Sequence, residues 1–240
     1  QIPRVNPVQV DFKAGGSPER IQHDRRRMLL HRLFENRLQI GRADVEAILR
    51  VHISEYFRLL DVPSSEQDRK RADFIESWPY APHLLQLLED QVLVATDAQE
   101  TRGPLLTAAD FRLDDANSGI GALLDSVANQ QHRTLREKAL RNLTSVVEAV
   151  PGHAAKVPHL QEIVGALWLR SIAVGNLAGA EPSTLQVDIT QGKAIDDNGF
   201  QVELATVIEN SFNIHQEGQR LVFREDENPQ AKLMASARND

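Results

Sequence analysis

The sequence contains no cysteine. Disulfide bonds and thiolate metal sites are therefore excluded, and the composition is typical of a protein in a reducing compartment. The apolar runs fall short of the roughly 18 residues that a membrane-spanning helix needs. The first residues also lack the hydrophobic stretch of a signal peptide. We therefore expect a cytoplasmic chain without a membrane partner.

Three further features are missing: an initiator methionine, a phosphate-binding loop and a recognisable catalytic motif. Because the chain opens on Gln1, we expect a fragment of a longer protein. No run matches Gly-x-x-x-x-Gly-Lys-Ser/Thr, whose backbone N–H groups cradle phosphates, and no Gly-x-Ser-x-Gly elbow is present. No two of the eight histidines are four residues apart, the helical spacing of zinc ligands. We expect no catalytic residue, metal or cofactor in this chain.

The composition is otherwise that of a folded globular chain. Hydrophobic residues make up 41% of the 240 residues and charged residues 25%, enough to bury a core. The formal net charge is −7. Because nucleic-acid affinity depends on neutralising phosphates, this charge disfavours nucleic-acid binding by the molecule as a whole and leaves it open only for local basic patches.

Helical periodicity runs through most of the chain. Apolar residues between Val45 and Leu60 recur at spacings of three and four, which predicts one buried stripe with His52 as a core histidine. A rigid turn at 78–82 precedes a leucine-rich helix. The other helices expected from the same pattern cover residues 18–36, 65–77, 118–150, 159–177 and 196–210.

The period changes to two near the end of the chain. Phe212 and Ile214 alternate with polar residues before the turn at Glu217-Gly218, and Leu221 and Phe223 do so after it. This predicts a β-hairpin with one apolar face. Together with a short apolar segment at 185–189, the element order becomes that of a winged helix. We predict a mainly α fold with a small β component: a helical lid-like bundle, a helical segment and a winged-helix domain ending in the hairpin.

Two segments carry a family resemblance. The first is Trp78–Leu85, followed by Gln99-Glu100-Thr101-Arg102-Gly103, and the second is the hairpin 214–223, followed by Glu227-Asn228-Pro229. Both resemble stretches of large P-loop (AAA+-like) ATPases of a domain-of-unknown-function family that accompany bacterial phage-defence and DNA-modification systems. Tyr80 stands where that family has Phe, and Ala81 where it has His.

The resemblance implies a domain order and a partner. Residues 1–103 would be the end of the ATPase module and its helical lid, 104–158 a helical connector, and 159–240 the winged-helix domain. ATP and Mg²⁺ would then bind only with a P-loop core that this chain lacks. The rest of the parent ATPase would be the partner, with a homo-oligomer or defence-system subunits as further alternatives.

The same resemblance points to one nucleotide-sensing candidate. Arg102, with Gln99 and Thr101 beside it, would lie on the lid where an arginine can reach the γ-phosphate through charge-assisted hydrogen bonds. The alternative is a surface or capping arginine. Gly103-Pro104 interrupts the helix expected from Thr96 within two turns, which predicts either a genuine turn or omitted residues.

Two basic groups are candidates for contact with nucleic acid or a partner. One is Arg25, Arg26 and Arg27 in the basic helix at 18–36, and the other is His215, Arg220 and Arg224 in the hairpin. For the first group, we favour a solvated helix face. For the second, the segment 181–226 carries nine acids against three bases, so packing against another domain is favoured over DNA.

Three functions remain open at this point. The leading interpretation is a non-catalytic regulatory and interaction fragment of a larger P-loop ATPase. The first alternative is a nucleic-acid-binding winged-helix module. The last is a globular domain, or a stand-alone enzyme, whose reaction no motif names.

Overall fold

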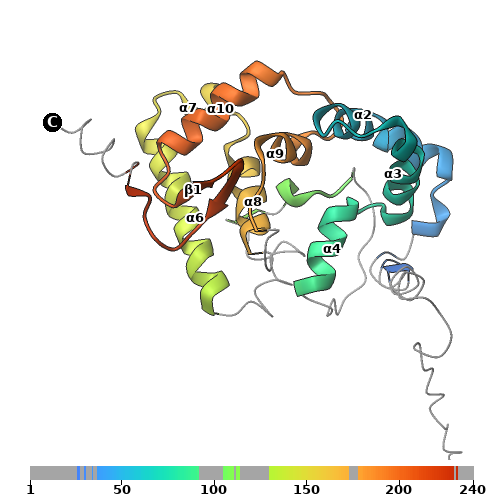
Figure 1. Cartoon of the computed structure of the whole chain (residues 1–240), viewed down its shortest axis with the longest axis horizontal. Coiled ribbons are helices and arrows are strands. Elements are labelled where there is room, and N and C mark those ends of the chain that lie inside the picture. Colours follow the sequence, from blue (N-terminus) through green and yellow to red (C-terminus); the bar gives the residue numbers. More distant parts are fainter. Residues whose placement is uncertain are drawn as a thin grey trace, which may run out of the picture.

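The structure is a computed structural model, and it describes residues 26–27, 30, 34, 37–91, 105–110, 112–113, 130–172, 178–229 and 231. Helices dominate this part of the chain, with one two-stranded hairpin near its end (Figure 1). The elements, in which η marks a 3₁₀ helix, are η1 (Arg37–Gln39), α2 (Arg42–Leu59), α3 (Ser64–Ser77), α4 (Pro82–Gln91), η2 (Ala108–Asp110), α6 (Gln130–Ala149), α7 (His153–Lys156), α8 (Leu160–Ser171), α9 (Pro182–Ile189), α10 (Asp197–Glu209), β1 (Ile214–Glu217) and β2 (Arg220–Phe223). The predicted mainly α fold with a small β component is confirmed.

The last elements have the order expected of a winged helix, with an isolated bridge beside the two-stranded hairpin. After α8, Ala180 forms an antiparallel bridge to Leu221 of β2, through N–H···O distances of 2.9 and 2.8 Å. Helices α9 and α10 follow, and β1 then pairs with β2 in the register Ile214↔Phe223. The sheet order is therefore Ala180, β2, β1, and the chain order is helix, strand, two helices and hairpin.

Two glycines permit this arrangement. Gly179 has φ +79°, and a Cβ on it would lie 2.3 Å from the carbonyl oxygen of Leu221. Only glycine therefore lets the chain approach β2 closely enough for the Ala180 bridge. Gly218 has φ +62° and begins the two-residue turn between β1 and β2.

Both edges of the hairpin are occupied by the protein itself. On the β2 side, the N–H of Phe223 donates to Ser171 Oγ at 2.8 Å. On the β1 side, the N–H of Asn228 donates to the carbonyl of Phe212 at 2.6 Å, and Asn228 Nδ2 donates to the carbonyl of Ile214 at 2.8 Å. These bonds satisfy polar groups that an exposed strand edge would offer to another chain.

Helices α8 and α9 lie in the middle of the molecule. Helix α6 and the hairpin pack on one side of them, and α2 and α3 lie on the other (Figure 1). One continuous apolar cluster runs through the described elements, and it includes Trp168, which is 2% exposed as expected for a core residue. The three predicted segments thus share a core, and their division into domains stays a prediction.

The structure refines several local predictions. Asp196 caps α10 as expected, because its Oδ2 accepts the N–H of Gly199 at 2.6 Å. The loop expected at 151–158 contains the short helix α7, which follows Gly152 in a left-handed conformation. Most of the helix expected at 18–36, and the parts expected at 92–104, 118–129 and 173–177, lie outside the described residues.

A buried asparagine pair anchors the hairpin to α6. Asn142 Oδ1 accepts the N–H groups of Phe212 and Asn213, and its Nδ2 donates to the carbonyl of Lys138 at 2.7 Å and to Asn213 Oδ1 at 2.9 Å. Asn213 Nδ2 in turn donates to the carbonyls of Glu225 and Asp226. Each amide is satisfied on both its oxygen and its nitrogen, which is what a buried polar group requires.

We predict that Asn142→Ala lowers the free energy of unfolding by about 2–4 kcal/mol, because it leaves the N–H groups of Phe212 and Asn213 buried without an acceptor. Urea unfolding followed by circular dichroism measures this. Asn198→Ala, an exposed asparagine on α10, is the matched control and should stay within about 0.5 kcal/mol. Equal effects in both variants would contradict the anchoring role.

Candidate functional site

The described residue with the most deeply buried charge is Asp188 on α9, at 0% exposure. Arg170 of α8 holds its carboxylate in a bidentate pair, with Nε at 2.5 Å from Oδ2 and Nη2 at 2.8 Å from Oδ1. His83 of α4 approaches from the other side, with Nε2 at 2.8 Å from Oδ1. Three helices that are far apart in sequence therefore meet at one carboxylate.

The electrostatics of this cluster follow from its burial. Burial alone would raise the pKa of Asp188, but the guanidinium of Arg170 and the contact with His83 outweigh it and hold the pKa below the usual value of aspartate. Burial, and then the positive charge of Arg170, lower the pKa of His83. Asp188 is therefore ionised and His83 neutral near pH 7.

Two further polar side chains tie neighbouring elements to α9. Thr107, just before η2, donates from Oγ1 to the backbone carbonyl of Asp188 at 2.6 Å. His52 of α2 contacts the carbonyl of Thr190 through Nδ1 at 2.5 Å. Its Nε2 has no hydrogen-bond partner, and burial lowers the pKa of His52 to about 4. We call His52, His83, Thr107, Arg170 and Asp188 the junction cluster.

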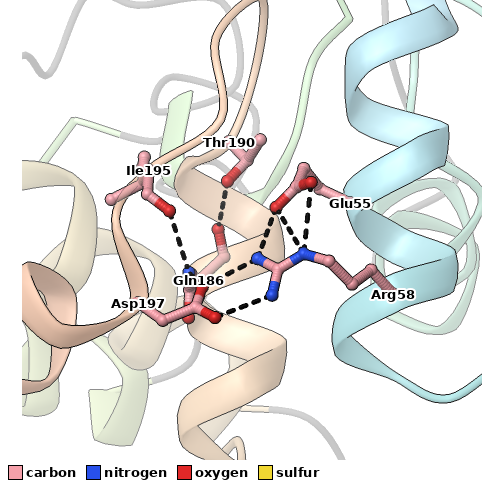
Figure 2. Close-up of polar contacts among 6 residues, drawn as sticks. All are labelled: Glu55, Arg58, Gln186, Thr190, Ile195 and Asp197. Atoms are coloured by element: carbon pink, nitrogen blue, oxygen red, sulfur yellow. Dashed lines mark hydrogen bonds and ion pairs between the residues drawn. The ribbon is translucent and has the colours of Figure 1, made fainter.

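A second polar contact joins α2 to the start of α10 at the surface (Figure 2). Arg58 donates from Nη1 and Nη2 to the two carboxylate oxygens of Asp197, each at 2.7 Å, and also pairs with Glu55. Gln186 of α9 donates to Asp197 Oδ1 at 2.7 Å. Hydrogen bonds from Arg58 and Gln186 lower the pKa of Asp197 to about 2. The N-terminus of α10 is thus attached to both α2 and α9.

The junction cluster is built to hold elements in place. Its carboxylate is paired with Arg170 and His83. The hydroxyl of Thr107 is completely buried and donates its proton to a backbone carbonyl. A nucleophile needs an oxygen that a substrate can reach, and the cluster offers none, because Thr107 and Asp188 are both fully buried. Among the described residues, no group of three or more His, Cys, Asp or Glu side chains could hold a metal ion.

The candidates expected from sequence fall into three sets. Arg102, Gln99, Thr101 and Arg25 lie outside the described residues, so their roles stay predictions. Arg26 is half-buried and Arg27 is exposed. The described residues before 37 lie near α3 and α4, at the end of the molecule opposite the hairpin (Figure 1). The basic residues near the start of the chain and the basic residues of the hairpin therefore do not form one surface.

The hairpin candidates contact the protein's own atoms. Arg220 donates to the carbonyls of Ala178 and Gly179 at 3.1 and 2.6 Å. Arg224 forms an ion pair with Glu217 across the hairpin. His215 lies with Nε2 at 2.9 Å from the carbonyl of Asp226.

Sequence reasoning missed the junction cluster, apart from placing His52 in the core. A signal was present, because Asp188 stands between Val187 and Ile189 and Arg170 follows Trp168-Leu169. A charge inside an apolar run must be paired if the run is buried. The sequence gives no signal for which residues pair with Asp188, because its partners lie on other helices.

Comparison with protein-family models, with curated proteins and with solved structures gave no match. Across the part of the chain that the structure describes, we find no helix with both the length and the apolar content needed to cross a membrane.

We predict that Asp188→Asn lowers the free energy of unfolding by about 3–5 kcal/mol, because it leaves the guanidinium of Arg170 largely buried without a counter-charge. The double variant Asp188→Leu/Arg170→Met should recover most of this loss, since it removes both charges. Urea unfolding of the single and double variants measures the coupling. If the loss of unfolding free energy in the double variant equals the sum of the losses in the two single variants, the two charges do not depend on each other.

We also predict that stability falls on acidification below pH 6.5. The pKa values of His52 and His83 are lowered in the folded state, so the unfolded chain binds protons more strongly at these residues. Their contribution to stability is present above pH 6.5 and is lost as the pH falls. For His52 the loss extends down to a pH of about 4, with a slope of up to about 1.4 kcal/mol per pH unit.

The measurement is urea unfolding of the wild type and of His52→Asn between pH 7 and the onset of acid unfolding. An asparagine amide can still donate to the carbonyl of Thr190 but does not titrate, so this variant should show a shallower pH dependence. Unchanged slopes in the variant would exclude His52 as a source of the acid sensitivity.

Proposed function

We propose that this chain is a non-catalytic regulatory and interaction module of a larger P-loop ATPase, of the kind that accompanies bacterial phage-defence and DNA-modification systems. The support from sequence is the pair of segments at 78–85 and 214–229 that resemble such ATPases. The support from structure is the winged-helix order of the elements from α8 to β2.

The observation that carries the interaction role is the surface of α10. In a winged helix this is the helix that enters the DNA major groove, where basic side chains contact phosphates. Here its first turn carries Asp197, already paired with Arg58. Its outward side presents Gln201, Val202 and Ala205, and Val202 is 67% exposed. The helix carries no basic side chain, and Glu209 is exposed at its last turn. A surface with an exposed valine and no cation suits a protein partner better than a phosphate backbone.

The junction cluster supports the regulatory part of the proposal. Arg170 and Asp188 belong to the winged helix, whereas His52 and His83 belong to the helices that precede it. Movement of α2 would break the contact from His52 to the carbonyl of Thr190, and movement of α4 would break the contact from His83 to Asp188. Because each break leaves a buried polar group without a partner, such movement would be resisted or transmitted at this cluster. A rigid connection of this kind is what a module needs to report the state of an attached ATPase.

We predict that Val202→Glu changes ATP turnover of the full-length parent by fivefold or more, because a charge in the centre of an apolar contact is costly. Ala154→Glu, which adds the same charge to an exposed position on α7, should leave turnover unchanged. Turnover is measured with a coupled phosphate-release assay. Equal turnover in both variants would contradict the α10 interface.

Two cheaper observations test the wider proposal. The full coding sequence should contain a Walker A motif, and a parent without one would contradict the ATPase assignment. In fluorescence anisotropy at low salt, this chain should show no tight binding of duplex DNA, because α10 carries no basic side chain. Tight binding that weakens steeply with salt would instead favour the nucleic-acid-binding alternative.

A further inference from the structure

A groove of about 330 Å³ runs along α6 beside the base of the hairpin. On one side it is lined by polar residues of α6, and on the other by Phe212, Asn213 and Glu227. The residues from α6 are Lys138, Arg141, Asn142, Thr144 and Ser145. This site is separate from the junction cluster and from the outward side of α10.

The two cations in the groove are not used by the rest of the described structure. Neither Lys138 nor Arg141 forms an ion pair or a side-chain hydrogen bond there. Glu137 lies four residues before Arg141, the spacing at which helical ion pairs form, yet the described structure contains no ion pair between them. Arg141 lines the groove instead. By contrast, the described arginines of the hairpin and Arg170 all bind groups of the protein.

The wall opposite α6 is held in position by the buried asparagine pair. Asn142 lies in the groove at 1% exposure and keeps the N–H groups of Phe212 and Asn213 in place. The groove is therefore preorganised, and its shape does not depend on the mobility of its two long side chains. Preorganisation lowers the entropic cost of binding.

From these observations we propose that the groove binds a phosphate group. Lys138 and Arg141 supply charge-assisted N–H donors, for which phosphate oxygens are strong acceptors. Thr144 Oγ1 has a long bond of 3.3 Å to the carbonyl of Leu140, so this hydroxyl can turn toward an anion at small cost. One carboxylate, Glu227, lines the groove as well, so two positive charges stand against one negative charge.

The ligand is either a phosphate monoester or inorganic phosphate, or the diester backbone of a nucleic acid. The net charge of −7 repels all of these at long range. Binding must therefore be local. With two cations in contact it should weaken only modestly with salt, less than for a protein whose whole surface is basic.

The test is amide NMR of the 240-residue chain with two probes: inorganic phosphate, and a short single-stranded DNA without a terminal phosphate. Chloride at matched ionic strength is the reference. We expect shifts of the amides at 138–145 and 212–213 with at least one probe, and the probe that acts identifies the source of the phosphate. Lys138→Gln/Arg141→Gln should weaken binding by at least about tenfold.

The matched control is Arg50→Gln/Arg133→Gln. It removes the same charge from two exposed arginines outside the groove that have no partner in the described structure. Binding should persist in this variant, and the melting temperatures of both double variants establish that they fold. Absence of shifts with both probes, shifts equal to those with chloride, or equal loss in the two double variants would overturn the proposal.

Discussion

The buried carboxylate of Asp188 is the constraint around which the rest of the structure is arranged. A carboxylate without access to water is costly unless it is paired and hydrogen-bonded, and Asp188 meets that condition through Arg170 and His83. Each partner lies on a different helix. The requirement to pair one charge therefore sets how α4, α8 and α9 meet, and the backbone bond from Thr107 adds the segment before η2.

The same principle explains how the hairpin is attached. A two-stranded hairpin is marginal by itself, and here polar groups on both of its edges have partners from other segments. Ala180 and Ser171 cover β2, Asn228 covers β1, and Asn142 holds its base against α6. The hairpin is consequently part of the core and not a free wing reaching toward a ligand.

These internal contacts bear on function because they use the charges that a winged helix would need for DNA. The arginines of the hairpin bind carbonyls and Glu217, and Asp197 at the start of α10 is held by Arg58. The outside of α10 carries no basic side chain and is partly apolar. The cations that remain unpaired lie elsewhere, and two of them, Lys138 and Arg141, face a common groove. A protein partner at α10 and a phosphate at α6 are therefore compatible proposals on separate surfaces.

Local patterns were enough to predict the kind of the longer elements. The stripe on α2, the cap by Asp196 and the alternation around Gly218 all depend on residues close together in the chain, so the helices and the hairpin could be derived from the sequence, with the turn displaced by one residue. The short helix α7 was missed because a four-residue helix has no periodicity to read.

The pairing of Asp188 with Arg170 and His83, of Asn142 with Asn213, and of Arg58 with Asp197 could not be derived in this way. Each joins residues from different helices or segments, and nothing in the order of residues states which buried charge meets which. Only the packing of α2, α4, α6, α8 and α9 around one core decides it, because burial removes water as the alternative partner and leaves each polar group to the side chains that the fold brings within reach.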